Sequence, residues 1–416
     1  MKNSIKAAFG VGLLLLLACG KTNSTAGGST VAPPPAPTVS APANGTAANG
    51  SNPASPGGTG IAGAQPGAAT GTAPGTPMAG AMDATPTMMG SAGAAAPPPE
   101  VMVDPADVMS CMGAGVPPDA TEQVDVIQIR TNDMNVVPGG FQAPGGTVYA
   151  CFWLDIDMPE KEHIIGWEGA IGGDRAVHHQ QVSISPKPIY LTQQGGLCGL
   201  PTVDFTWTGE KPTEWTPKLV GFPIGGPENG GKAHFLWQTH FESATTYTGG
   251  FNVYVTKKLR KYDGGNFEQG DVSGILVPKM SSATHVADCT GDMTQQKLTH
   301  PIYVYASMQH AHLTITHIKS EQIRGGNSIF TFGDQTTMGV LGFFDQQFKP
   351  WTPCVEVLPG DELKTTCDYT NNNPVDVTGG EGLNQEMCVT FFQYFPRLSG
   401  PNQFCGTIDS SGGFGH

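Results

Sequence analysis

The sequence predicts an all-β protein in which antiparallel β-sandwiches follow a long unstructured segment. Three observations support this prediction. Of 416 residues, 57 are Gly and 35 are Pro, which excludes a coiled coil or a helical bundle. All but one of the aromatic residues lie in residues 141–416, so the core must be there. Between residues 122 and 410, short alternating apolar and polar runs are separated by Gly, Pro, Asn and Asp, which is typical of antiparallel sandwiches.

Residues 1–19 have the pattern of an export signal. Lys2 and Lys6 precede the apolar run 9–18, which is too short to cross a bilayer as a mature helix. The run ends in LLAC at residues 16–19, which resembles a bacterial lipobox, whose Cys is lipidated after cleavage. An ordinary signal peptide with a chance Cys is the alternative. We therefore expect an exported lipoprotein of the bacterial cell envelope, held at the outer membrane or the cell surface by lipid on Cys19.

Residues 20–120 are predicted to be a disordered linker, because Ala, Gly, Pro and Thr cannot bury enough apolar surface to offset the entropy of ordering them. The remainder holds 18 basic and 30 acidic residues, a net charge of −12, which argues against nucleic-acid binding. Its length of about 290 residues suggests two domains. Glycines near residues 264–270 offer a boundary, so we expect domains at 121–267 and 268–410.

Cysteine usage agrees with export. With Cys19 set aside for lipid, an even number remains: Cys111, Cys151, Cys198, Cys289, Cys354, Cys367, Cys388 and Cys405. An even count in an oxidising compartment indicates disulfides, and no CxxC spacing indicates a zinc or redox site.

Histidines provide the candidate chemistry. His310 and His312 alternate on a predicted strand, so both face one side and a single metal ion can bridge them. Satisfied surface or core histidines are the alternative. His178 and His179 are neighbours, which point to opposite faces of a regular strand, so joint ligation requires a strand end or a distortion. In the strand 234–241, His240 projects away from the apolar side chains.

Other catalytic motifs are absent from the two expected domains. Residues 121–410 contain no HExxH, GxSxG, P-loop or GxGxxG pattern. Any redox chemistry must therefore come from a metal.

Four collinear segments together resemble the copper type II, ascorbate-dependent monooxygenases, a family that includes peptidylglycine α-hydroxylating monooxygenase and dopamine β-monooxygenase. The segments are 172–182 (GGDRAVHHQQV), 220–241 (VGFPIGGPENGGKAHFLWQTHF), 302–313 (IYVYASMQHAHL) and 360–396, with its GD turn and Glu-Met-Cys. Ala306 and Ser307 before the HxH, together with EMCV, are nearer the dopamine β-monooxygenase branch. The resemblance implies two jelly-roll-like sandwiches with one copper site in each.

The resemblance assigns two sets of ligands. His178, His179 and His240 match the first copper site, called the H site. His310, His312 and Met387 match the second, called the M site, where O₂ and substrate meet. The resemblance also implies the disulfides Cys367–Cys388 and Cys289–Cys405. The pairing of Cys111, Cys151, Cys198 and Cys354 stays open.

The donor chemistry agrees with this assignment. Three imidazoles hold copper in both oxidation states, while a thioether favours Cu(I). Three protein ligands leave a position open, as catalysis requires. The alternative for Met387 is an ordinary core methionine packed by Phe391.

The expected enzyme is a monooxygenase with two coppers per chain that uses O₂ and ascorbate or a similar one-electron donor to hydroxylate an activated C–H bond. The peptide-amidating branch holds a substrate carboxylate with an Arg, an Asn and a Tyr, where this chain has Met308, Val389 and Phe391. We therefore expect a small apolar or aromatic substrate against these residues, with one hydrogen bond from Gln393.

Two other functions fit parts of the pattern. A copper-binding lipoprotein could handle or sense the metal without turnover, although a carrier needs only one site. A purely structural surface sandwich would leave the placed histidines and Met387 unexplained.

Overall fold

The computed structural model describes residues 102–407, except 114, 147, 172–174, 186, 189–190, 201, 209–212, 337–346, 381–383 and 400–403. The described residues belong to one compact unit, Ser91–His416. The predicted export signal, Cys19 and most of the predicted linker lie outside the described residues. Within the described part, no helix has the length and apolar character needed to cross a membrane.

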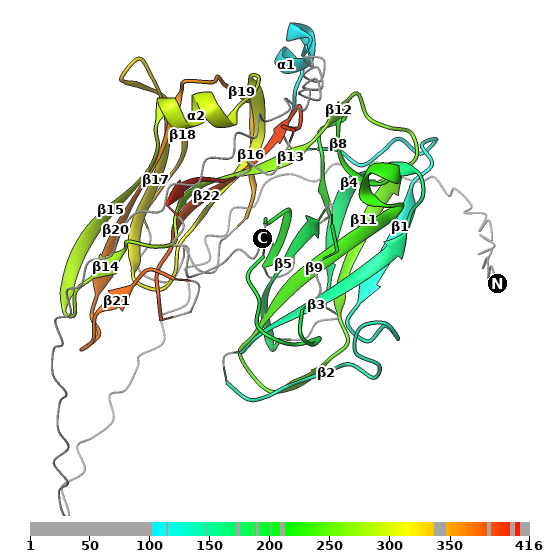
Figure 1. Ribbon diagram of the computed structural model, residues 1–416, viewed down its shortest axis with the longest axis horizontal. Helices are drawn as coiled ribbons and strands as arrows, with labels where there is room; N and C mark the ends of the chain where they lie inside the picture. Colours follow the sequence, from blue (N-terminus) through cyan, green and yellow to red (C-terminus); the bar gives the residue numbers. More distant parts are fainter. Residues whose placement is uncertain are drawn as a thin grey trace, which may run out of the picture. The chain divides into compact units, whose positions relative to one another are not determined.

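The first sandwich is built from two main sheets (Figure 1). The larger has the order β1-β11-β4-β8-β12, with β7 paired to β4, and comprises β1 (Asp125–Arg130), β4 (Lys161–Ala170), β7 (Glu214–Trp215), β8 (Val220–Gly225), β11 (Gly250–Thr256) and β12 (Tyr262–Asp263). The smaller has the order β3-β9-β5-β6 and comprises β3 (Val148–Asp157), β5 (Val177–Ser185), β6 (Phe205–Thr208) and β9 (Lys232–Phe241). The accessory elements are β2 (Phe141–Ala143), β10 (Thr245–Tyr247) and the 3-10 turn η1 (Pro227–Asn229).

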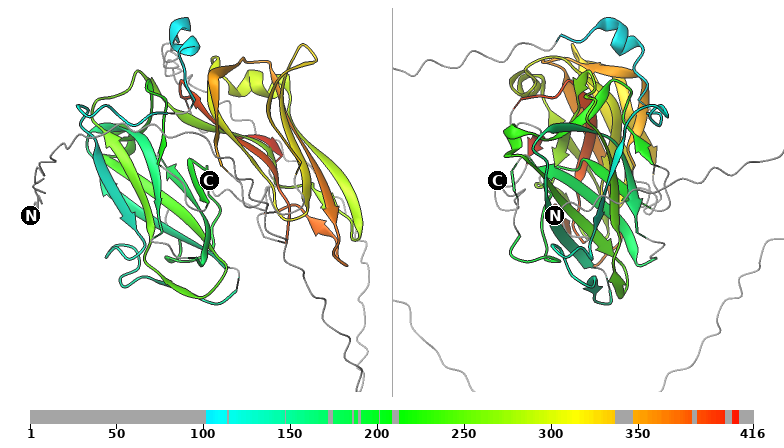
Figure 2. Two further views of the ribbon diagram at one scale, coloured as in Figure 1. Left: turned by 180° about the vertical axis from the view of Figure 1, so that it is seen from behind. Right: turned by 90° about the vertical axis from the view of Figure 1, so that its right-hand side faces the viewer.

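The second sandwich also has two main sheets, and Figure 2 shows the β15-β20-β17-β18 sheet as one layer of long strands. That sheet comprises β15 (Ser281–Cys289), β17 (Ile315–Arg324), β18 (Asn327–Thr336) and β20 (Glu362–Asn371). The other has the order β19-β16-β22-β13-β23 and comprises β13 (Gly265–Asp271), β16 (Ile302–His310), β19 (Lys349–Val357), β22 (Cys388–Phe395) and β23 (Phe404–Thr407). The accessory elements are β14 (Leu276–Val277), β21 (Val377–Thr378) and helix α2 (Gly291–Lys297).

This architecture confirms the prediction of an all-β, sandwich-like fold. Nearly all strand pairs are antiparallel; β8–β12 and β13–β23 are parallel. The sheets divide between β12, which ends at Asp263, and β13, which begins at Gly265. The predicted boundary between residues 267 and 268 thus falls inside β13.

The last part of the predicted linker is instead part of the fold, and this corrects the prediction for residues 102–120. Helix α1 (Pro105–Met109) is capped by the Asp104 carboxylate, which accepts a hydrogen bond from the Ala106 amide. Farther along, the Gly113 amide donates to the Trp351 carbonyl at 3.0 Å. A disulfide between Cys111 and Cys354 of β19 anchors the segment. Composition alone predicted disorder here, because it cannot show contacts with residues as distant in sequence as Trp351 and Cys354.

Alternation along β9 explains how the fold presents functional side chains. Phe235, Trp237 and Phe241 are fully buried in the hydrophobic core, where they contact neighbouring aromatic rings. The intervening residue His240 pairs with Tyr149 of β3 and with His179 of β5. The smaller sheet therefore packs one face into the core and displays a row of polar side chains on the other.

Four disulfides connect the described residues. Cys289–Cys405 and Cys367–Cys388 are the pairs that the family resemblance implied. The pairing left open by the sequence is Cys111–Cys354 and Cys151–Cys198.

We expect non-reducing peptide mapping of the full chain to recover these four linked pairs, because each pair is joined in the fold and all but Cys198 are at least nine-tenths buried. Mass spectrometry of a proteolytic digest, with a reduced digest as control, checks this. Recovery of Cys111 as a free thiol, or joined to Cys151, would contradict the anchoring of the α1 segment.

Candidate metal centres and the cavity between them

Three imidazoles converge at one end of the β3-β9-β5-β6 sheet. His178 and His179 come from β5 and His240 comes from β9. One nitrogen from each ring lies within 4.8 Å of the other two, so all three can reach a single ion. The ring centroids are 5.0–5.3 Å apart. The structure thus brings together the three residues that the sequence assigned to the H site.

A β-bulge allows the neighbours His178 and His179 to join the same cluster. Val177 pairs with Phe241 and His179 pairs with His240, so His178 is one extra residue on the β5 side of the ladder. A bulge of this kind re-aims a side chain that would otherwise point to the opposite face. The sequence required either a strand end or a distortion for joint ligation, and the structure contains the distortion.

Burial favours the neutral, metal-binding form of His179 and His240. Desolvation is the main cause that lowers the pKa of His179 well below its usual value, and the neighbouring histidines His240 and His178 lower it further. The pKa of His240 falls to about 4, chiefly through burial and then through His178. Tyr149 stacks on the His240 ring with centroids 4.3 Å apart. The Glu242 carboxylate lies 3.2 Å from His178 Nδ1.

A second donor set lies at the end of β16. The His310 and His312 rings are perpendicular, with centroids 5.1 Å apart, and His310 Nε2 lies 3.2 Å from the Met387 sulfur. His312 Nδ1 lies 2.9 Å from the Gln385 carbonyl. Because a carbonyl oxygen only accepts, Nδ1 carries the proton and Nε2 is the atom for a metal. The three residues assigned to the M site are therefore neighbours in space.

Glu386 holds the backbone of this second set, a role that the sequence analysis did not assign. Its carboxylate accepts the His312 amide at 2.8 Å and also accepts the amide and hydroxyl of Thr314. The side chain is fully buried, and desolvation raises its pKa. In the sequence, the only feature that pointed to Glu386 was its place directly before Met387 in the Glu-Met-Cys run.

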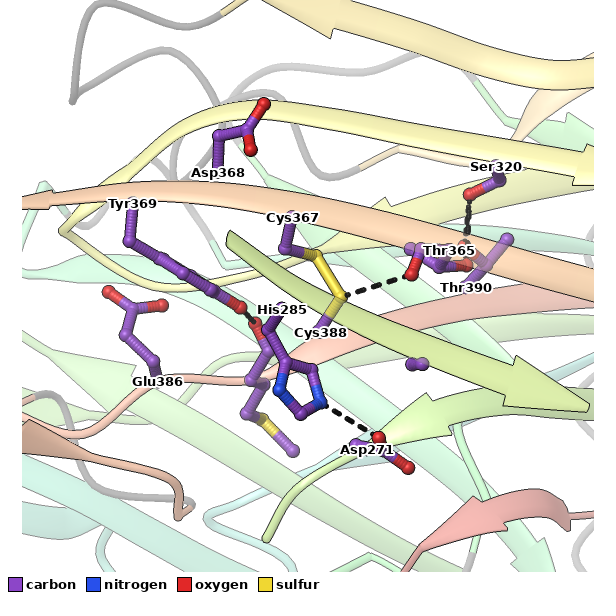
Figure 3. Close-up of a disulfide and its surroundings, with 12 residues drawn as sticks. Asp271, His285, Ser320, Thr365, Cys367, Asp368, Tyr369, Glu386, Cys388 and Thr390 are labelled. Atoms are coloured by element: carbon purple, nitrogen blue, oxygen red, sulfur yellow. Dashed lines mark hydrogen bonds and ion pairs between the residues drawn. A yellow bond between two sulfur atoms is a disulfide. The ribbon is translucent and has the colours of Figure 1, made fainter. Parts of the chain in front are cut away.

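The Met387 backbone is also held by β20. The Tyr369 hydroxyl donates to the Met387 carbonyl at 2.8 Å. The Cys367–Cys388 disulfide ties β20 to the first residue of β22 (Figure 3). Met387 is therefore positioned by a hydrogen bond and by the disulfide of its neighbour. Such supports limit the freedom of the thioether.

All three residues of the second donor set, and His179 of the first, line one cavity of about 60 Å³. Its lining combines residues of the first sandwich (Tyr149, His179, Gln181, Gly199, Leu200, Val203 and Gln238) with residues of the second (His310, His312, Met387 and Phe391). Of the substrate contacts predicted from the sequence, Phe391 lines this cavity. Met308, Val389 and Gln393 are buried outside its described lining, and the Gln393 amide donates to the Asp204 carbonyl at 2.9 Å.

The two donor sets fit copper by their chemistry. Three buried imidazoles suit copper in either oxidation state, and two imidazoles with a thioether suit Cu(I). Neither set includes a carboxylate, which a site for Mg²⁺ or Ca²⁺ would need.

Comparison with known proteins finds similarity to the copper type II ascorbate-dependent monooxygenases. Residues 262–410 match the model of the copper type II ascorbate-dependent monooxygenase C-terminal domain. Tyramine beta-hydroxylase of Caenorhabditis briggsae is 30% identical over 66% of this chain and 49% of its own length. Human dopamine beta-hydroxylase is 26% identical over 64% of this chain and 46% of its own. Human DBH-like monooxygenase protein 1 is 27% identical over 61% and 45%, respectively.

The chain spans about half the length of these curated relatives. Residues 262–410 contain His310, His312 and Met387, as well as the two disulfides that the resemblance implied. The chain is similar to the copper type II ascorbate-dependent monooxygenases, and its residues 262–410 match the C-terminal domain of that family.

Proposed function

We propose that this protein is a copper-dependent monooxygenase that hydroxylates an activated C–H bond of a small apolar or aromatic substrate, using O₂ and a one-electron donor such as ascorbate. The observation that carries the proposal is that two buried donor sets of different softness contact one cavity, the second through all three of its residues and the first through His179. A protein that only carries or senses copper needs one such set, so the pair favours the enzyme over the copper-handling alternative.

Two coppers per chain are part of the proposal. His178, His179 and His240 would hold one, and His310, His312 and Met387 would hold the other. Copper, when bound, supplies the one-electron steps and the activation of O₂. Each set has only three protein ligands, which leaves room for an exchangeable ligand.

The chain itself shapes the substrate space. Leu200, Val203 and Phe391 give the cavity an apolar lining, while the Gln181 and Gln238 amides offer hydrogen bonds. Among the described lining residues there is no Lys or Arg. A substrate carboxylate would lack a charge-assisted partner there, which supports an apolar or aromatic substrate over a peptide carboxylate.

The cellular location is proposed from the sequence. The apolar run 9–18 followed by Cys19 supports export and a lipid anchor, and the four disulfides are typical of an oxidising compartment. The predicted place is the bacterial cell envelope.

We expect the full chain, loaded with Cu(I) and freed of excess metal, to hold two coppers by elemental analysis, because each donor set is complete within the chain. Zinc loading serves as the control, since a thioether is a poor ligand for zinc. A preparation that holds one copper, or that retains zinc in preference to copper at both sites, would contradict the two-site assignment.

Replacing Met387 by Ile should abolish ascorbate-dependent oxygen uptake and leave one copper bound, because the branched hydrocarbon removes the thioether without exposing the core. The matched control is Met158→Ile, since Met158 is an equally buried methionine in the first sandwich, 7% exposed like Met387. The reciprocal variant His178→Ala should lose the other copper. Wild-type turnover in Met387→Ile would eliminate the proposed role of the thioether.

Glu386→Ala should destabilise the second sandwich by about 2–5 kcal/mol, because it leaves the His312 amide and two Thr314 donors buried without their acceptor. The free energy of unfolding in urea measures this. The same variant should bind one copper, at the first set. Glu386→Gln keeps one carbonyl acceptor and should lose less stability. An unchanged unfolding midpoint with two bound coppers would show that Glu386 does not position His312.

A further inference from the structure

One wall of the cavity belongs to the first sandwich and is formed by residues 199–200 and 202–204, which have no regular secondary structure. Gly199, Leu200 and Val203 from this stretch line the cavity. The stretch starts after the Cys151–Cys198 disulfide, where the Gln238 amide also donates to the Cys198 carbonyl at 2.9 Å. It ends where β6 begins at Phe205. Irregular backbone needs partners for its amides and carbonyls, so the groups that satisfy this wall decide its shape.

Three of those partners come from the second sandwich. The Val203 amide donates to Glu268 Oε1 at 3.1 Å, and the Asp204 carbonyl accepts from the Gln393 amide at 2.9 Å. The Asn266 amide group donates to Asp204 Oδ1. Glu268, Asn266 and Gln393 are at most 2% exposed. We call these three residues the clasp.

The clasp is one patch on the sheet that also carries the second donor set. Asn266 lies opposite Gln393, and Glu268 lies opposite Phe391, in the register of β13 against β22. Phe391 in turn lies opposite Met308 of β16, two residues before His310. Because cross-strand neighbours share a face, the clasp fixes the wall relative to Phe391, another residue that lines the cavity.

Asp204 connects the clasp to the first sandwich. Its Oδ2 accepts from the Ile184 amide at 2.7 Å and from the Thr202 hydroxyl at 3.1 Å, while Oδ1 and the carbonyl accept from the clasp. Apolar contacts alone would not fix one position of the wall relative to the second sandwich, because they have no preferred direction. Buried hydrogen bonds instead specify one arrangement, because each group left unsatisfied is costly.

We propose that Glu268, with Asn266 and Gln393, is a positioning residue that holds the Val203 wall beside the substrate cavity. The cavity then has its shape only when the clasp residues form their hydrogen bonds with Val203 and Asp204. The role of the cavity rests on the proposed function. The hydrogen bonding of the wall does not, and it can be measured without copper or substrate.

Protonation of Glu268 is a consequence that can be tested. The pKa of Glu268 is raised to about 8, chiefly by burial and also by the Asp204 charge, while the hydrogen bond from the Val203 amide acts in the opposite direction. The other titratable groups around Asp204 are Arg397, which follows β22, Tyr305 of β16 and Tyr394 of β22. The pKa of Asp204 is raised to about 6.

The sign of the pH dependence follows from the raised pKa of Glu268. The folded chain keeps a proton on Glu268 that the unfolded chain releases above pH about 4.5, so this group reduces stability as pH rises from there to about 8. Above that pH the fold must hold a buried carboxylate beside Asp204. The clasp is therefore expected to loosen on the alkaline side.

The test is hydrogen–deuterium exchange of the Val203 amide in the full chain, corrected for the intrinsic effect of pH. Glu268→Ala should speed exchange about tenfold or more at pH 7, because the amide loses its acceptor. Glu268→Gln keeps a carbonyl acceptor and cannot ionise. It should match the wild type at pH 7 and lack the acceleration that the wild type shows above pH about 8. Glu162→Gln is the control, since Glu162 is a buried glutamate of β4 in the first sandwich and contacts Lys257 rather than the wall.

Equal exchange at Val203 in the wild type and Glu268→Ala, or an alkaline acceleration that persists in Glu268→Gln, would overturn the proposal. If Glu268→Ala does not fold, the pH comparison between the wild type and Glu268→Gln is decisive alone. If the copper-loaded wild type shows no ascorbate-dependent oxygen uptake while Val203 exchanges as described above, the proposed function is wrong and the clasp still stands.

Discussion

The extra residue His178 in β5 is the constraint on which the first metal centre depends. In a regular strand His178 and His179 would face opposite sides of the sheet, and at most one of them could approach His240. The bulge between Val177 and His179 removes that restriction and brings three imidazole nitrogens within 4.8 Å of one another. The second set uses a different departure from regularity. His312 lies beyond the end of β16, where the Glu386 carboxylate holds its amide.

Each sandwich supplies one donor set, and the cavity needs both. The first set sits on strands whose opposite face is filled by Phe235 and Trp237, so its backbone rests on the core. The second is held by Glu386, Tyr369 and a disulfide. The contacts between Asp204 and the β13–β22 face then join the two halves. Rigid supports of this kind keep His179, His310, His312 and Met387 at the wall of one cavity, where they would help to hold copper.

Much of this arrangement could be predicted from local sequence. Strand alternation was enough to turn His240 away from the apolar face. It also predicted that His310 and His312 lie together, although β16 ends at His310. The spacing of His178 and His179 identified the need for a distortion, although no local pattern shows which register shift provides it. The collinear order of the motifs supplied Met387, which alternation alone would have left as a core methionine.

The remainder depends on contacts between distant segments. Cys111 joins Cys354 across 243 residues, and no spacing rule selects that partner over Cys151 or Cys198. The same holds for Glu386 and Glu268, because no local pattern shows which distant backbone amide will donate a hydrogen bond to a buried carboxylate. The predicted substrate contacts show the limit of alternation. Met308, Val389 and Phe391 share a face, but only Phe391 reaches the described cavity lining.

X-ray absorption at the copper edge of the Cu(I)-loaded chain tests the central claim most directly, because sulfur and nitrogen scatterers are distinguished by their distance from the metal. Two centres of different composition predict one sulfur neighbour for every two coppers, with imidazole nitrogens as the remaining protein donors. A spectrum that contains only nitrogen donors, or sulfur on every copper, would contradict the account.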